Sequence, residues 1–260
     1  MTTYRRHAAS YLILVRREQD GYRYPDCRRE QVKAEWMSGG AIMEEKAGIV
    51  FSIARDNAPV PGCTVSKNIY DGLNSITYFS LARGTDISAE THPDRQIIIA
   101  ADGVLDVYGT DVASVELKTG DCMLVPANAT VGMKTAEGVV YTEITLRKED
   151  HMNELVKAGE VFKLADLVPY QDGKIVNMDV MHGEGMKFAL LAFDAGTGLS
   201  EHAAPGEAIV FALDGNGVIG YEGKEYPIRA GENFHFAKGG KHYVKADGKF
   251  KMALLLTLEA

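Results

Sequence analysis

Side chains able to do chemistry are concentrated in two related stretches of this sequence. Glu90, His92 and Gln96 stand at even spacing, so they share one face if their stretch is a β-strand. His202 lies in the second stretch, and His242 follows it toward the C-terminus. Imidazole, amide and carboxylate groups can bind a polar ligand, and imidazole and carboxylate can also exchange protons with a substrate. The sequence therefore offers one candidate cluster in each half of the chain.

The two stretches are copies of one pattern. Residues 84–103 read GTDISAETHPDRQIIIAADG, and residues 196–215 read GTGLSEHAAPGEAIVFALDG. They align without a gap, with glycines at both ends and with Ser88 matched to Ser200. A repeat of this length predicts an internal duplication, so each half should form the same structural unit.

Short apolar runs separated by turn residues predict an all-β protein. Strands recur about every ten residues, with Gly and Asp between them, which is typical of antiparallel β-barrels. We expect an N-terminal extension (1–46), a first barrel (47–146), a connector (147–187) and a second barrel (188–260). Within the connector, apolar residues at helical spacing predict a short helix over residues 149–158.

Composition and charge argue against several classes of partner. The net charge of −8 and the pI of about 5.4 predict no nucleic-acid and no membrane partner, because no basic stripe offsets phosphate repulsion. The apolar run at 11–15 is too short for a membrane span or a signal-peptide core. The cysteines Cys27, Cys63 and Cys122 are few and widely spaced, which fits reduced thiols in a cytoplasmic protein.

The N-terminal extension belongs to neither copy of the repeat. Residues 1–36 are rich in Arg and Tyr and show no clear period. We expect the extension to be either a disordered tail or an arm that docks on a neighbour. Such an arm would help the chain form a homodimer, which is the assembly we expect.

Each half resembles the cupin superfamily, and together they resemble a two-domain bicupin of the small bacterial cupin type-2 kind, whose activity is unassigned. The matching motif positions are Gly196, His202, Gly215, Gly231 and His242 in the second half, and Gly84, His92, Gly103, Gly120 and Pro126 in the first. The resemblance covers about residues 47–260. It implies two tandem RmlC-like jelly-roll β-barrels with a short helical connector.

The resemblance also implies where a metal would bind. Cupin metal sites typically use three His and one Glu or Gln, a donor set that suits Fe, Mn, Ni or Zn. The second half keeps His202 and His242, whereas Ala204 and Ala208 replace the other two ligands. His235 lies in the same hairpin as His242 and would join them if its strand carries it inward.

The first half keeps a different part of the ligand set. Glu90, His92 and Gln96 hold three of the positions, and Val131 replaces the last histidine. Three alternatives remain open for each barrel. The first is a divalent transition metal, and the second is a polar pocket that binds a small ligand without a metal. The third is that these side chains only pack or hydrogen-bond among themselves.

Two functions compete on this basis. The first is binding of a small polar metabolite in a barrel interior, with the C-terminal barrel favoured and with or without a divalent metal. The alternative is a metal-dependent enzyme of the isomerase, lyase or dioxygenase class. In that enzyme His202 and His242 would act on a small carbonyl or sugar-acid substrate.

Overall fold

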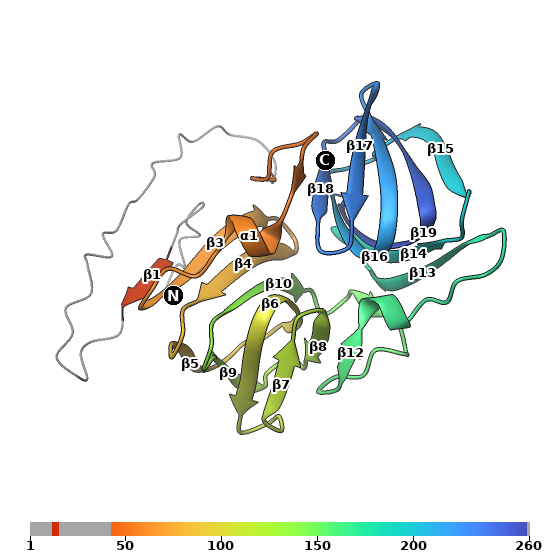
Figure 1. The fold of residues 1–260 in the computed structure, drawn as a ribbon. Helices are drawn as coiled ribbons and strands as arrows, with labels where there is room; N and C mark the ends of the chain where they lie inside the picture. The colour runs from red at the N-terminus through yellow and green to blue at the C-terminus, as the bar shows by residue number, and fades with distance from the viewer. Residues whose placement is uncertain (1–11, 16–42, 259–260) are drawn as a thin grey trace.

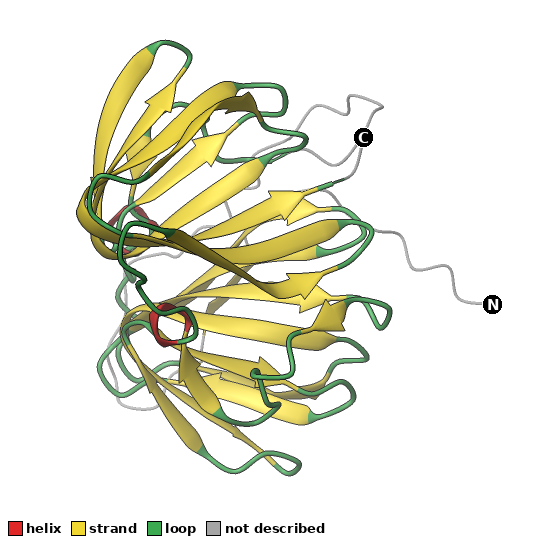
Figure 2. Ribbon diagram, turned by 90° about the vertical axis from the view of Figure 1, so that its right-hand side faces the viewer, coloured by secondary structure: helices red, strands yellow, loops and turns green. Residues whose placement is uncertain are grey.

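A computed structural model describes residues 12–15 and 43–258 and shows a protein built mostly of β-strands. Apolar residues alternate with polar ones along many of these strands, which gives each strand a face for a core. The strands form antiparallel sheets that curl into two barrels lying one above the other in Figure 2. The predicted all-β fold of two tandem barrels is confirmed.

The first barrel contains most of the strands from the first half of the chain. Its main path runs β1 (Leu12–Val15), β3 (Cys63–Asp71), β4 (Ser75–Leu81), β10 (Val139–Leu146), β6 (Arg95–Gly109), β8 (Asp121–Val125) and β12 (Val161–Lys163). The other strands are β5 (Asp86–Thr91), β7 (Val115–Lys118) and β9 (Thr130–Lys134). β9 pairs with both β5 and β6, and β7 pairs with β6.

The second barrel repeats this arrangement. Its main path runs β11 (His151–Met152), β13 (Ile175–His182), β14 (Met186–Phe193), β19 (Lys241–Thr257), β16 (Ala208–Tyr221), β18 (Asn233–Phe236) and β2 (Val50–Phe51). β15 (Gly198–Ala203) pairs with β19, and β17 (Lys224–Arg229) pairs with β16. β15 and β16 therefore hold the second copy of the repeated stretch, as β5 and β6 hold the first.

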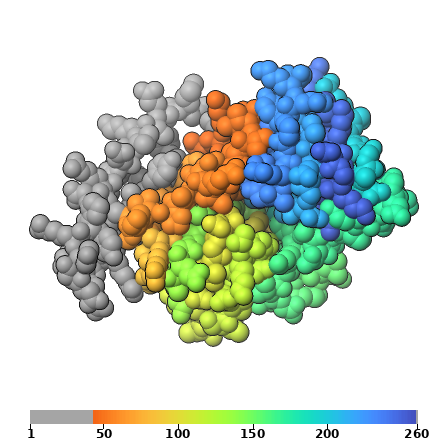
Figure 3. Space-filling model, viewed as in Figure 1, coloured from red at the N-terminus to blue at the C-terminus, as the bar shows by residue number. Residues whose placement is uncertain are grey.

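Each barrel includes one strand from the part of the sequence that forms the other barrel. β2 lies between β1 and β3 of the first barrel in sequence but pairs with β18 of the second, whereas β12 lies between β11 and β13 of the second barrel but pairs with β8 of the first. Figures 1 and 3 show the segment around β2 lying against the second barrel. Each strand leads into a short helix, α1 (Ile53–Asp56) or η1 (Leu164–Asp166). The predicted boundaries had placed β2 wholly within the first barrel.

Hydrophobic cores lie inside each barrel and between the two barrels. Alternation along β6 shows the division, because Ile98 and Ala100 face the first barrel whereas Ile97 and Ile99 belong to the core between the barrels. Along β16, Phe211 joins that shared core and Val210 faces the second barrel. The two barrels are thus joined by buried apolar surface as well as by the exchanged strands.

The predicted connector helix is absent from the structure. Residues 149–158 form turns around β11, and Leu155 of the expected apolar face is 63% exposed. The Asp150 carboxylate accepts a hydrogen bond from the Arg147 backbone N–H at 2.7 Å, and Asn153 Oδ1 accepts one from Leu155 at 3.0 Å. Such local side-chain bonds compete with helical ones. The short helical element of the connector is η1.

Two further expectations are affected by the structure. Cys63 is disulfide-bonded and Cys122 is a buried free thiol, so the expectation of reduced thiols throughout is wrong for Cys63. Cys27 lies outside the described residues. The apolar run at 12–15 forms β1 and pairs with β3, and the rest of the extension up to residue 42 also lies outside them. Among the described helices, none has the length and apolar character needed to cross a membrane.

Candidate functional site

The second barrel brings together the two histidines singled out by the sequence. His202 on β15 stands directly opposite His242 on β19, and their ring centroids are 4.2 Å apart. His242 is only 5% exposed, whereas His202 is exposed. The His242 ring also stacks on Phe236, with centroids 4.0 Å apart. The pair thus lies at the boundary between the apolar, aromatic interior of the barrel and solvent.

Backbone hydrogen bonds fix the orientation of both rings. Nδ1 of His202 lies 2.9 Å from the Ser200 carbonyl oxygen, and Nδ1 of His242 lies 3.0 Å from that of Gly240. Because a carbonyl oxygen can only accept, each Nδ1 must carry a hydrogen, which leaves the Nε2 of a neutral ring with a lone pair. Neither Nε2 has a hydrogen-bond partner among the described residues. Two acceptors are therefore available to a ligand.

The environment of His242 favours its neutral form. Burial lowers the pKa of His242, and the neighbouring His202 lowers it further, while the bond to the Gly240 carbonyl acts in the opposite direction. Desolvation disfavours the charged imidazolium, so the ring presents an acceptor near neutral pH.

His235 does not join this pair. Phe234 and Phe236 on the same strand face the barrel core, so alternation turns His235 to the opposite face. There its Nε2 lies 2.6 Å from Oε2 of Glu207, and its Nδ1 lies 2.7 Å from the Glu45 carbonyl oxygen. The contact with Glu45 joins the segment before β2 to the second barrel, and the contact with Glu207 lies within that barrel, so both nitrogens are occupied. The expectation that His235 would approach the site is corrected accordingly.

The first barrel holds a different polar cluster. Gln96 is 3% exposed, and its position on β6 shares the parity of Ile98 and Ala100, which face the barrel. Its Nε2 donates to Oε1 of Glu143 on β10 at 2.9 Å. Glu143 shares the parity of Tyr141, which also faces this core. A carboxyl and an amide are thus paired inside the first barrel.

Glu143 is a candidate functional residue that the sequence reasoning missed. Burial raises its pKa to about 7, against which the hydrogen bond from Gln96 acts more weakly. The Tyr141 hydroxyl is buried and has no hydrogen-bond partner among the described residues. The sequence signal for this residue was a lone glutamate in the apolar run 139–146. The residues two positions before and after it are uncharged.

The other two predicted residues of the first barrel lie nearer to solvent. Glu90 stands opposite Val131 and is exposed, and His92 is half-buried. No hydrogen bond joins either side chain to another described residue. The structure therefore places Gln96 in a buried contact but does not bring Glu90 and His92 into contact with it.

The described residues do not make a complete metal site. Within them, no group of three His, Cys, Asp or Glu side chains is placed to hold an ion. His202 and His242 supply two nitrogens, while Ala204 and Ala208 are both buried at the remaining cupin positions. Two imidazoles would leave most of the coordination of Fe, Mn, Ni or Zn to water. These residues therefore do not fit a metal cofactor of the kind that the resemblance implies.

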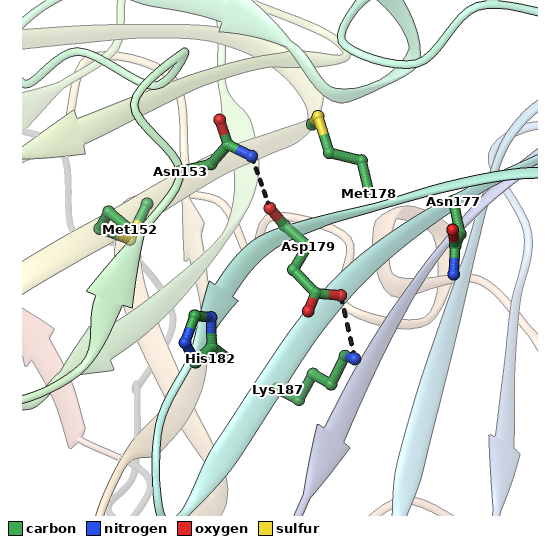
Figure 4. A pocket seen from close by; sticks show the side chains of 7 residues that line it. All are labelled: Met152, Asn153, Asn177, Met178, Asp179, His182 and Lys187. Atoms are coloured by element: carbon green, nitrogen blue, oxygen red, sulfur yellow. Dashed lines mark hydrogen bonds and ion pairs between the residues drawn. The ribbon is translucent and has the colours of Figure 1, made fainter.

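A separate cleft lies along β11, β13 and β14 of the second barrel (Figure 4). It has a volume of ≈ 340 Å³ and is lined by Met152, Asn153, Asn177, Met178, Asp179, His182 and Lys187. Asp179 and Lys187 form an ion pair at 3.0 Å, and the Asn153 amide donates to the Asp179 backbone oxygen at 2.9 Å. These groups mainly satisfy one another, so the histidine pair offers more unused binding capacity.

Comparison with protein families supports the fold. Residues 189–258 match the family model described as a cupin domain. No curated protein matches the chain.

Solved structures extend the likeness to both barrels. A cupin 2 conserved barrel domain protein from Leptotrichia buccalis is 24% identical with a TM-score of 0.73, covering 83% of this chain and 99% of that one. A mutant salicylate 1,2-dioxygenase from Pseudoaminobacter salicylatoxidans is 11% identical with a TM-score of 0.52, covering 71% and 70%. An oxalate decarboxylase from Lactobacillus farciminis is 12% identical with a TM-score of 0.50, covering 82% and 86%. These likenesses show the fold.

Proposed function

We propose that this cupin-fold protein binds a small polar metabolite at the C-terminal barrel, through the Nε2 atoms of His202 and His242. The observation that carries the proposal is the pair of facing rings, 4.2 Å apart, whose Nε2 atoms have no partner among the described residues. Their Nδ1 atoms are already held by backbone carbonyls, so ordering the rings costs little when a ligand binds.

The chemistry of the pair favours a ligand rich in hydroxyl groups. Two Nε2 lone pairs accept hydrogen bonds, and neighbouring hydroxyls of a sugar or sugar acid can donate one to each. The buried Phe236 ring stacks on His242 and gives the pair an aromatic, apolar setting. Few polar groups on an aromatic wall are typical of small-molecule sites.

NMR of the histidine rings tests the proposal directly. Glycerol, ribose and glucuronate are titrated separately into the protein while the ring signals of all histidines are followed. We expect saturable shifts of His202 and His242 together with at least one probe, and loss of those shifts in His202→Ala. His151 and His182 provide a matched control, because they form another stacked pair with centroids 5.2 Å apart. Equal shifts of both pairs, or none with any probe, would contradict the proposal.

A divalent metal on the same two imidazoles is the alternative to a metal-free site. Metal analysis of protein purified without chelator separates the two. Stoichiometric Fe, Mn, Ni or Zn that is lost in His202→Ala would overturn the metal-free site. Metal-free protein whose stability is unchanged by added divalent ions would support it.

One observation favours a second candidate function, proton transfer in the first barrel. A carboxyl with a pKa of about 7 is well matched to general base catalysis near neutral pH. Gln96 occupies Oε1 of Glu143, which leaves Oε2 for a substrate proton. Such a base would abstract a proton next to the carbonyl group of a small substrate.

Hydrogen–deuterium exchange checks this second candidate without knowledge of the product. Small keto acids and sugar acids are incubated with the protein in D₂O, and loss of the proton next to the carbonyl is followed by NMR. We expect exchange that falls at least about 100-fold in Glu143→Gln and persists in His202→Ala. Exchange that is unchanged in Glu143→Gln would remove Glu143 from this role.

A further inference from the structure

The exchanged segments meet at a cavity between the two barrels. Its volume is ≈ 340 Å³, and its wall includes Ile53 of α1, Leu164 of η1, Ile99 of β6, Thr142 of β10 and Phe211 of β16. Figure 1 looks onto this junction, with α1, β18, β8 and β12 around it. Ile99 and Phe211 belong to the core between the barrels and not to either barrel interior. The cavity is therefore separate from the histidine pair and from the Gln96–Glu143 pair.

The wall contains one buried polar group that no atom of the described residues satisfies. Thr142 is 1% exposed, and its hydroxyl has no hydrogen-bond partner among the described residues. It faces away from the first barrel, as do its neighbours Val140 and Ile144, which belong to the core between the barrels. An unpaired buried hydroxyl is costly, so its presence beside a cavity indicates a partner that arrives from outside the chain.

The charged groups of the wall are already paired. Lys163 Nζ lies 3.8 Å from Oδ1 of Asp121, and Oε1 of Glu232 lies 3.3 Å from Nε of Arg229. A charged ligand would find no unmatched partner here and would lose its hydration on entering. The remaining wall is largely apolar, including Ile53 and Phe211.

We propose that this cavity binds a small uncharged molecule that is mostly apolar and carries one hydroxyl group, of the phenol or alicyclic-alcohol class. The apolar wall takes the ring, and the Thr142 hydroxyl exchanges a hydrogen bond with the ligand oxygen. Because such a ligand contacts both barrels and both exchanged segments, it binds only when they are docked. It therefore stabilises the folded chain by mass action.

Phenol and cyclohexanol are the probes, and benzene is the control that lacks the oxygen. Binding is measured by calorimetric titration and by the rise in the unfolding temperature of the full chain. We expect saturable binding of phenol or cyclohexanol that weakens by about tenfold in Thr142→Val, which keeps the shape of the side chain and removes the hydroxyl. We also expect benzene to bind wild type and Thr142→Val equally.

Three further variants make the test specific. Ser80 carries another buried hydroxyl without a described partner, but it lies outside the cavity wall, so Ser80→Ala should leave phenol affinity unchanged. Ala54 lines the cavity, so Ala54→Leu should abolish binding by filling it. Binding should persist in His202→Ala, which separates this site from the barrel. No saturable binding of either alcohol, or equal losses in Ser80→Ala and Thr142→Val, would overturn the proposal.

Discussion

Single residues show that the two copies keep different polar groups on the same framework. Pairing across β5 and β9 sets Glu90 opposite Val131, where β15 and β19 set His202 opposite His242. Conversely, Gln96 and Glu143 are hydrogen-bonded in the first barrel, whereas the residues at the equivalent positions of β16 and β19 in the second barrel are apolar. Each barrel is thus polar where the other is apolar, so the two sites should respond to different ligands and to different pH ranges.

The pKa of Glu143 makes folding stability depend on pH. Since that pKa is raised from 4.5 to about 7, the folded chain holds the proton more tightly than the unfolded chain does. Its contribution is fully present below about pH 4.5 and is lost as the pH rises through about 7. The loss is at most about 3 kcal/mol, and less because the side chain keeps some contact with solvent. Urea unfolding between pH 4 and pH 8 measures it.

The matched variants for that measurement are Glu143→Gln and Glu137→Gln. Glu143→Gln keeps an oxygen for the Gln96 amide and removes the titration, so its stability should fall less than that of wild type between about pH 5 and pH 8. Glu137 is exposed in the same barrel, and its variant should follow wild type. Parallel curves for wild type and Glu143→Gln would show that this carboxyl is not buried in the folded chain.

The His242 ring should titrate below the usual histidine range. Burial lowers its pKa most, and His202 lowers it further against the opposing bond to the Gly240 carbonyl. The stability that the ring contributes is therefore present above about pH 6.5 and is lost as the pH falls through the folded pKa. In His202→Ala we expect the pKa of His242 to rise, because a neighbouring charge and part of the burial are removed. NMR titration of the His242 ring measures this, with His182→Ala as the control. A pKa of His242 that stays the same or falls would contradict the geometry of the pair.

The elements show how far the sequence could predict this fold. Glycines, turns and the repeated stretch at 84–103 and 196–215 predict the strands and their duplication, because turn chemistry is local. The exchanged segments VFSIA (50–54) and VFKLA (161–165) also repeat, but at a spacing one residue shorter, which a gapless comparison misses. Which sheet a short edge strand joins depends on distant partners, so local pattern alone cannot assign it.

For the candidate site residues too, local pattern predicts some placements, whereas others depend on distant partners. The meeting of His202 with His242 could be predicted from motif positions, because register is carried by the strands on either side. The outward direction of His235 depends on where its strand begins, and one residue of shift would reverse it. Glu143 stands outside the motifs, so only the packed barrel shows that it is buried beside Gln96.

The exchanged strands should contribute unequally to stability. Phe51 of β2 is 7% exposed and belongs to the core between the barrels, whereas Phe162 of β12 is partly buried against it. We expect Phe51→Ala to lower the free energy of unfolding by about 3 kcal/mol and Phe162→Ala by about 1 kcal/mol. Chemical unfolding followed by circular dichroism measures both. Equal losses would indicate that the two segments are packed alike.

The whole molecule is held together by buried surface shared between barrels. The core between them includes Cys122 and Ile99 from the first barrel and Phe211 and Leu255 from the second. β2 and β12 cross this boundary in opposite directions. Separation of the barrels would therefore expose apolar surface and break two strand pairings at once, which favours unfolding of the chain as one unit.

Cys122 reports on that cooperativity, because it lies in the shared core. Burial raises its pKa to about 12, so the folded chain has almost no thiolate at neutral pH, and the sulfur itself is inaccessible. Under non-reducing conditions, which keep the Cys63 disulfide closed, we expect a thiol reagent to label Cys122 only as fast as the chain unfolds globally. In Phe51→Ala the labelling and unfolding rates should rise together. Labelling much faster than global unfolding would show that the barrels separate while each remains folded, and the exchanged strands would then not be sufficient to couple them.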